Sequence, residues 1–330
     1  MDRNPNHDGL NRRQFLDRLT KAGISIAAAG AAGFWFHDAK GPVSSEPGPS
    51  NIILKDFSVG VPTQKMSIIR GKDRVATLQT ALKSLGGIET FIKKGDRVLL
   101  KVNAAFASPA MLSATTHPAI VAEMTRLCFR AGAASVVVTD NPINDPASCF
   151  ALTGIADAAR NAGARVVLPR DDLFSPMTVK GAKLIRNWPV LYRPFTDITK
   201  VIGMAPLKDH HRSGASMTMK NWYGLLGGRR NIFHQDINGI IMELAMMVKP
   251  TLVILDATTA MVTNGPTGGS LSDLKNTDTM IASTDQVAAD AFGASLLGRS
   301  LDKLPYIGKA NAAGIGTADY LKLNPVRASI

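Results

Sequence analysis

Short runs rich in Val, Ile and Leu recur along this chain and alternate with segments that carry apolar residues at helical spacing. Continuous apolar runs of this length are typical of strands buried on both faces of a sheet. The alternation predicts an α/β fold: a mostly parallel β-sheet flanked by helices on both faces, in a single large domain. The strand-like runs lie at 97–103, 135–140, 164–168, 197–204, 251–256 and 279–283, and the helical patterns at 118–131, 155–162, 237–248 and 283–297.

Polar residues stand at or just after the carboxyl ends of several of these runs. They are Asn103, Asp140, Lys208, Asp256 and the segment 283–285. In open α/β sheets, ligands bind in the crevice beyond the carboxyl ends of the strands. We therefore expect a binding site at that edge of the sheet.

The segment 208–234, called here the basic segment, combines histidines with cationic side chains. It holds three of the six histidines of the chain, His210, His211 and His234, and five Lys or Arg residues. Its glycines allow the backbone to come close to a ligand or to adopt positive φ angles. A packed core does not need this chemistry, so the basic segment is predicted to bind an anion or a metal.

Arg12 and Arg13 precede an Ala- and Gly-rich apolar run at 22–36. A charged region followed by a short apolar region is the layout of a signal peptide, and the arginine pair indicates twin-arginine export. The run is roughly 15 residues long, whereas a membrane span needs about 20. We expect 1–40 to be a twin-arginine signal peptide or an uncleaved anchor, 41–50 a Pro/Ser/Gly linker, and 51–330 the folded domain.

Export and charge together limit the partners. The expected location is the periplasm or the outer face of the cytoplasmic membrane, with the twin-arginine translocation machinery as a partner. Membrane contact would be made through the N-terminal segment, if that segment is uncleaved. The net charge of +12 favours a small anionic ligand. A nucleic-acid partner is not expected, because no basic stripe is interleaved with aromatic residues.

The chain has only two cysteines, Cys128 and Cys149. A usual iron–sulfur cluster takes four thiolates, so a cysteine-ligated cluster is not expected. A count of two does not decide whether the pair forms a disulfide.

Several motifs together resemble those of the DUF362 family of uncharacterised bacterial and archaeal proteins, some of which are labelled iron–sulfur centre proteins. The resemblance runs from about 51 to 323 and is most specific at Lys220-Asn-Trp-Tyr-Gly224 and at Ser283-Thr-Asp-Gln-Val-Ala-Ala-Asp290. It implies no agreed reaction. The ferredoxin-like cysteine module of some members is missing here, so the iron–sulfur label does not carry over.

Two interpretations of the site follow from these residues. In the favoured one, Lys and Arg side chains bind carboxylate or phosphate oxygens while histidines donate hydrogen bonds. In the other, His210, His234 and Asp256 hold a divalent transition metal, although their spacing lacks the regular intervals of metal motifs. The candidate ligand-binding residues are Lys101, Asn103, Lys208, His210, Arg212, Asn221, His234 and Gly265.

Lys220 and Asp256 are the candidate catalytic residues. Lys220 would act as an electrophile, a base or an anion clamp, and Asp256 as a general base or metal ligand. The sequence selects no reaction and leaves open whether the protein is an enzyme. The leading hypothesis is an exported protein that binds a small anionic ligand, with or without a metal. The alternatives are a non-catalytic redox partner or cofactor-handling protein for an exported metalloenzyme, and a scaffold.

Overall fold

The computed structural model describes residues 12–35, 52–60 and 65–330, and the chain divides into two compact units, Met1–Pro42 and Val43–Ile330. In the first unit, helix α1 spans Arg12–Trp35. Among the described residues, no helix is long and apolar enough to cross a membrane. The predicted linker at 41–50 and the parts of the predicted signal at 1–11 and 36–40 lie outside the described residues.

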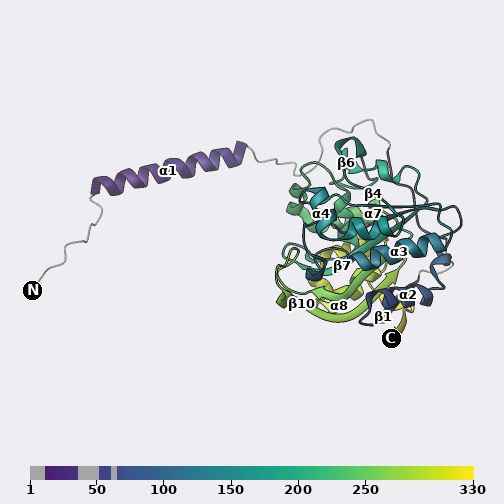
Figure 1. Cartoon of the computed structure of the whole chain (residues 1–330). Helices are drawn as coiled ribbons and strands as arrows, with labels where there is room; N and C mark the ends of the chain where they lie inside the picture. Colours follow the sequence, from purple (N-terminus) through teal and green to yellow (C-terminus); the bar gives the residue numbers. More distant parts are fainter. Residues whose placement is uncertain (1–11, 36–51, 61–64) are drawn as a thin grey trace, which may run out of the picture. The chain divides into compact units, whose positions relative to one another are not determined.

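The larger unit is built on a mixed, mostly parallel sheet (Figure 1). Its strand order is β11-β1-β10-β9-β7-β2-β3-β4, and β8 pairs with β7 off this path. Five of its pairs are parallel, whereas β10 runs antiparallel to β1 and β9, and β8 runs antiparallel to β7. The strands are β1 (Met66–Arg70), β2 (Arg97–Lys101), β3 (Ser135–Thr139), β4 (Arg165–Val167), β7 (Lys200–His210), β8 (Gly214–Ser216), β9 (Leu252–Met261), β10 (Leu274–Ser283) and β11 (Val326–Ser329). Strands β5 (Phe174–Met177) and β6 (Trp188–Leu191) form a separate antiparallel hairpin.

Helices cover both faces of the sheet. Successive side chains of each strand point to opposite faces, and because both sets are apolar, both faces must be shielded from water. Val98 and Leu100 of β2 join the hydrophobic cluster formed with α2, α3, α4 and α5. Leu99 joins the cluster formed with α6, α7, α8 and α9. The helices of the larger unit are α2 (Arg74–Ser84), α3 (Pro118–Arg130), α4 (Pro146–Leu152), α5 (Ile155–Asn161), α6 (Thr218–Asn221), α7 (Ile237–Met247), α8 (Gln286–Leu296) and α9 (Pro305–Ala312). The predicted fold class is confirmed.

Each predicted strand run overlaps a strand of the structure. Two of the predicted carboxyl ends, those at Asp256 and at 283–285, lie elsewhere than expected. Strand β9 continues past Asp256 to Met261, so Asp256 lies within the strand and not at its end. Strand β10 is antiparallel to β9. The segment 283–285 that follows it therefore lies at the opposite edge of the sheet from the carboxyl ends of β2, β3, β7 and β9.

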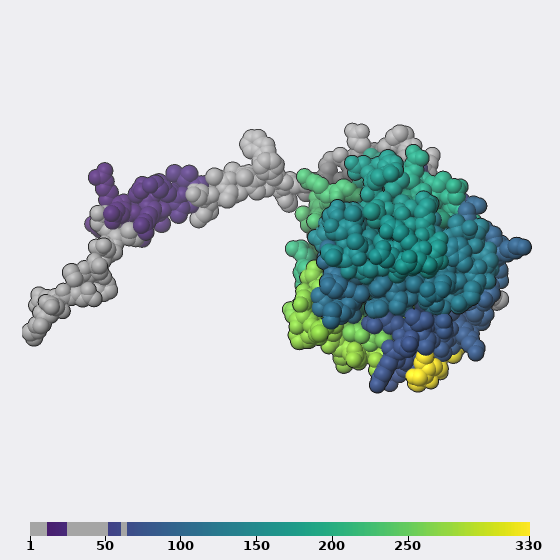
Figure 2. Space-filling model, viewed as in Figure 1, coloured from purple at the N-terminus to yellow at the C-terminus, as the bar shows by residue number. Residues whose placement is uncertain are grey.

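The last described residues return to the first strand of the sheet. Strand β11 pairs in parallel with β1, with Ser67 opposite Val326. Figure 1 places the C-terminal end beside β1, and Figure 2 shows the yellow C-terminal residues against the dark blue region of β1 and α2. The sequence did not predict β1 or β11, because each strand is short and shows no recognisable alternation of polar and apolar residues.

Candidate functional site

A cavity of about 520 Å³ opens at the carboxyl ends of β2, β3 and β7. This carboxyl-edge cavity is bounded by the loops after β2 and β3, the end of β7, the turn from α6 into the short helix η5 (Trp222–Leu225), and the short helix η6 (Arg230–Asp236). The loop after β9 closes one side. Its lining includes Asn103, Phe106, Asp140, Asn141, Ile143, Lys208, His210, His211, Lys220, Asn221, Tyr223, Gly224, Arg230, Asn231, His234 and Gly265.

A buried ion pair forms part of the floor of the cavity. The Nζ atom of Lys101, at the end of β2, is 2.7 Å from Oδ1 of Asp140, which follows β3. The same ammonium donates to the carbonyl oxygens of Val102 at 2.7 Å and Asn221 at 2.8 Å. An ammonium has three N–H groups, so these partners leave none for a ligand. Lys101, predicted to bind ligand, therefore shapes the floor and is not part of the lining.

Asn221 connects the ends of β2 and β7. Its Oδ1 accepts from Nζ of Lys101 at 3.2 Å and from Nδ2 of Asn103 at 3.3 Å. Its Nδ2 donates to the carbonyl oxygens of Lys101 and Met204, both at 3.2 Å. Both asparagines lie at the cavity as predicted, but most of their hydrogen-bonding capacity is used by the protein itself.

At position 224, only glycine fits against this ion pair. A Cβ atom at position 224 would lie 1.9 Å from Oδ1 of Asp140 and 2.9 Å from Nζ of Lys101. Real Cβ atoms do not approach other heavy atoms this closely. The glycine therefore lets η5 pack directly on the charged pair, which brings Lys220 and Tyr223 to the cavity.

Three further cations line the cavity. Lys208 is 1% exposed, and its Nζ donates to the carbonyl oxygen of Ala114 and lies 5.0 Å from the centroid of the Phe106 ring. Nζ of Lys220 lies 5.1 Å from the Tyr223 ring centroid and has no hydrogen-bond or ion-pair partner among the described residues. Arg230 is buried and donates to backbone carbonyls at 2.6 to 3.1 Å, those of Asn141, Pro142 and Leu226.

The lining of the cavity carries less negative charge than positive charge. Among the described residues that line the cavity, Asp140 is the only carboxylate, and it is already paired with Lys101. Burial, reinforced by the charge of Lys220, lowers the pKa of Lys208 to about 7. Burial and the charge of Arg230 lower the pKa of Lys220 to about 8. Both lysines would regain ordinary basicity beside a bound anion.

His210 is a neutral donor toward the cavity. Its side chain is buried, and its Nδ1 accepts from the backbone N–H groups of Arg212 and Ser213, both at 3.2 Å. A neutral imidazole with an accepting Nδ1 carries its proton on Nε2. Burial and the nearby cations, Lys220 first among them, lower the pKa of His210 to about 2, so the ring stays uncharged.

His234 has the opposite tautomer. Its Nδ1 lies 3.1 Å from the carbonyl oxygen of Asn231, which can only accept, so Nδ1 carries the proton and Nε2 has a free lone pair. Burial and the charge of Lys220 lower its pKa. The rings of His210 and His234 are nearly parallel, with centroids 6.1 Å apart. Together, His210 and His234 therefore present one imidazole donor and one imidazole acceptor to the cavity.

Asp256 lies elsewhere. Its Oδ2 accepts from Nε of Arg74 at 3.0 Å and its Oδ1 from the backbone N–H of Thr258 at 2.9 Å. Since β9 continues through it, Asp256 shares a face with Ile254, toward α2 and α3. The proposed set of His210, His234 and Asp256 is not brought together. The part of the chain that the structure describes contains no group of three His, Cys, Asp or Glu side chains placed to hold a metal ion.

Of the two remaining predicted residues, Gly265 lines the cavity and Arg212 does not. Gly265 lines the cavity and is buried, where its N–H donates to Oδ2 of Asp209 at 2.8 Å. Arg212 does not line it; its side chain is exposed, and its backbone N–H fixes the tautomer of His210. Tyr223 and Arg230 line the cavity without having been selected from the sequence. The arginine pair of the basic segment was the signal for Arg230.

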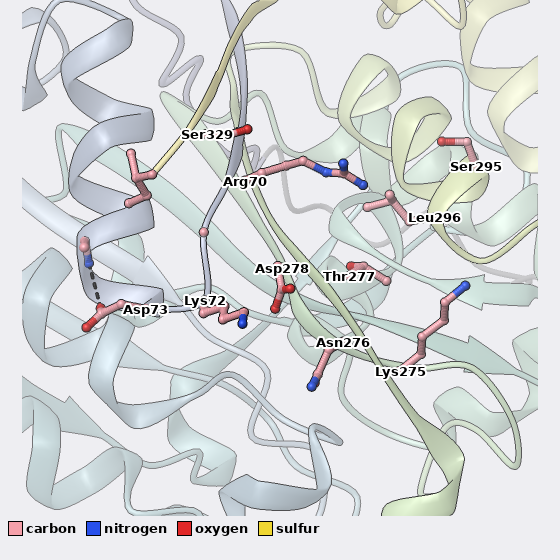
Figure 3. A pocket seen from close by; sticks show the side chains of 13 residues that line it. Arg70, Lys72, Asp73, Lys275, Asn276, Thr277, Asp278, Ser295, Leu296 and Ser329 are labelled. Atoms are coloured by element: carbon pink, nitrogen blue, oxygen red, sulfur yellow. Dashed lines mark hydrogen bonds between the residues drawn. The ribbon is translucent and has the colours of Figure 1, made fainter.

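A larger hollow of about 850 Å³ lies at the end of β1, beside β10 and β11 (Figure 3). Figure 3 shows the side chains of Arg70, Lys72 and Lys275 around it, together with Asp73 and Asp278. These three cations are exposed and therefore well solvated. The hollow lacks the buried, unmatched charge of the carboxyl-edge cavity, where we place the candidate site.

The comparisons with known proteins agree with the motifs. The family described as Domain of unknown function (DUF362) matches residues 98–295, which is more than half of the chain. The chain belongs to the DUF362 family. The matched region contains the whole carboxyl-edge cavity.

This DUF362 protein is also similar to the thylakoid-associated protein sll1697 of Synechocystis sp., at 29% identity over 229 residues, which cover 66% of this chain and 67% of that protein. Among solved structures, the lactate racemase apoprotein from Thermoanaerobacterium thermosaccharolyticum aligns with a TM-score of 0.39 and 10% identity. That alignment covers 74% of this chain and 58% of the racemase, less than two thirds of its length. A likeness this weak carries no activity over to the DUF362 protein.

Gly224→Ala is expected to destabilise the protein by more than about 3 kcal/mol, because the added methyl group would break the buried Lys101–Asp140 pair. Chemical denaturation measures the change. Gly308→Ala is the matched control, since nothing lies within 4 Å of its Cβ position in α9. There alanine should be neutral or stabilising by up to about 1 kcal/mol. Equal stability of the two variants would contradict the close packing at Gly224.

Stability should rise with pH between about 7 and 9. In the unfolded chain Lys208 keeps its proton up to its ordinary pKa of 10.5, whereas in the folded protein it loses the proton near pH 7. The unfolded state then binds more protons, so the free energy of unfolding increases by up to about 1.4 kcal/mol per pH unit for this group. Below pH 7 the penalty for the buried charge is fully present.

Lys208→Met should flatten this slope when denaturation midpoints are followed from pH 7 to 9. Lys309→Met, at an exposed position in α9, should leave it unchanged. An identical slope in Lys208→Met and the wild type would show that Lys208 does not titrate in this range.

Proposed function

We propose that this DUF362 protein binds a small carboxylate or phosphate anion in the carboxyl-edge cavity. The observation that carries the proposal is the unmatched charge of the lining: among the residues described there, Lys208, Lys220 and Arg230 face one carboxylate, Asp140, which Lys101 already pairs. Buried charge without a counterion is costly. An anion in the cavity would supply the counterion.

The donors expected to hold the anion come from different elements. Lys220 offers an ammonium that has no partner among the described residues, and His210 offers the N–H of Nε2. Lys208 adds a second ammonium, and Arg230 adds charge from a guanidinium that backbone carbonyls hold in place. Charge-assisted hydrogen bonds of this kind are roughly twice as strong as neutral ones.

Lys220 and His234 suit proton transfer to or from the bound ligand. A lysine with a pKa of about 8 is partly neutral near neutral pH, and Nε2 of His234 has a free lone pair. Groups whose pKa lies near the working pH are the efficient general acids and bases. We therefore retain Lys220 as the proposed catalytic residue and assign no catalytic role to Asp256.

Lys220→Ala is expected to abolish the binding of phosphate and malonate while changing the free energy of unfolding by less than about 1 kcal/mol. Isothermal titration calorimetry measures binding, and thermal denaturation with and without the anion measures stabilisation through mass action. Lys309→Ala should bind like the wild type. Retained binding in Lys220→Ala would refute the assignment, and unfolding of that variant would favour a scaffold role.

We also propose that the protein is exported through its N-terminal segment. Arg12 and Arg13 are exposed at the start of α1, where a translocation receptor can reach them. The name of the thylakoid-associated relative is compatible with a membrane-associated location. This proposal is independent of the ligand.

Replacing Arg12 and Arg13 together by lysine should retain the protein in the cytoplasm, because a twin-arginine signal depends on both guanidinium groups. Immunoblots of periplasmic and cytoplasmic fractions measure the distribution. Arg18→Lys, an exposed substitution on the same helix, should not change it. Unchanged export of the double variant would rule out a twin-arginine signal.

A further inference from the structure

A second hollow adjoins the carboxyl-edge cavity. It has a volume of about 550 Å³ and shares four lining residues with the cavity: Asn141, Ile143, Arg230 and Asn231. This adjoining hollow extends toward the β5–β6 hairpin, where Phe174 and Pro189 line it. The shared lining residues place the two spaces side by side.

The turn at 226–230 contributes Gly227, Gly228 and Arg229 to the adjoining hollow and Arg230 to both spaces, and it is held firmly. The N–H of Gly227 donates to the carbonyl oxygen of Pro189 at 2.8 Å, and Nε1 of Trp188 donates to the carbonyl oxygen of Gly227 at 3.1 Å. A Cβ atom at position 227 would lie 2.6 Å from the Phe174 ring, so the turn packs tightly on the hairpin. The arginines that follow are therefore presented from a fixed backbone.

The two consecutive arginines differ in their partners. Arg230 is buried and bonded to backbone carbonyls, including that of Pro142 at 2.6 Å. Arg229 lines the adjoining hollow, has an exposed side chain and has no ion-pair partner among the described residues. Arg170 also lines this hollow, but Asp172 binds it through two hydrogen bonds. Asp172 itself is not part of the lining; among the described residues, the lining has one carboxylate, that of Asp171.

Where the two spaces adjoin, the lining has an apolar contact surface. Ile143 lines both, and its side chain is 58% exposed. An exposed isoleucine between two cationic sites is suited to a hydrocarbon spacer, because burying it removes apolar surface from water.

We propose that the ligand is an elongated bis-anion: one anionic group binds at Lys208 and Lys220, a spacer passes Ile143, and a second anionic group reaches Arg229. This inference rests on the proposed anion-binding function and adds the ligand class to it. The shared chemistry is two carboxylates, or two phosphates, separated by an apolar chain.

The test compares ligands of equal length that differ in the second charge. Octanoate and suberate have the same number of carbons, and suberate carries a carboxylate at each end. Calorimetric titration of the wild type should show suberate binding at least about tenfold more tightly than octanoate, as expected for one additional charge-assisted contact. Hexyl phosphate and hexanediol bisphosphate, which share the same carbon chain, form a parallel pair that tells phosphate ligands from carboxylate ligands.

Arg229→Ala should remove the preference for suberate or hexanediol bisphosphate while leaving octanoate or hexyl phosphate binding unchanged. Arg186→Ala, at an exposed position outside both spaces, should behave like the wild type. If the monoanions bind and the long bis-anions bind no more tightly, the inference is wrong while the proposed function stands. If no anion binds the wild type, the proposed function fails, and the inference with it.

Discussion

The buried Lys101–Asp140 ion pair is the interaction on which the site depends. It joins the ends of the adjacent parallel strands β2 and β3, and Asn221 extends the connection to β7. Removing either partner would leave an uncompensated buried charge, which is strongly destabilising. Because Gly224 packs directly on the pair, the backbone that carries Lys220 and Tyr223 is fixed relative to the sheet.

On this floor the protein holds more positive charge than it neutralises. Lys208 and Lys220 have lowered pKa values because they are buried beside other cations, and burial beside the same cations favours the neutral rings of His210 and His234. The neutral rings are not equivalent. His210 can donate from Nε2 and His234 can accept there, because the backbone fixes a different tautomer for each. The cavity thus combines cations that attract an anion with an imidazole nitrogen, Nε2 of His234, that can accept a proton.

The sequence predicted the fold well because apolar runs and helical periodicity reflect burial directly. It also selected Lys208, His210, Lys220 and His234, since cations and histidines in one segment are rare in a core. It could not assign Asp256, because nothing local shows that β9 continues for five more residues to Met261. Nor could the sequence show that Lys101 is paired with Asp140 or that Tyr223 and Arg230 line the cavity. Those facts depend on pairings between segments far apart in the chain and on short helices without a periodic signal.

Proton uptake on anion binding tests the central claim most directly. If a bound anion neutralises Lys208 and Lys220, it raises their pKa values from about 7 and about 8, and the complex takes up protons near pH 7.5. Calorimetric titration of a dicarboxylate, which is fully ionised at this pH, in buffers of different ionisation enthalpy counts these protons. The account predicts net uptake that is strongly reduced in Lys208→Met. Binding without proton uptake would show that the anion does not bind at these lysines.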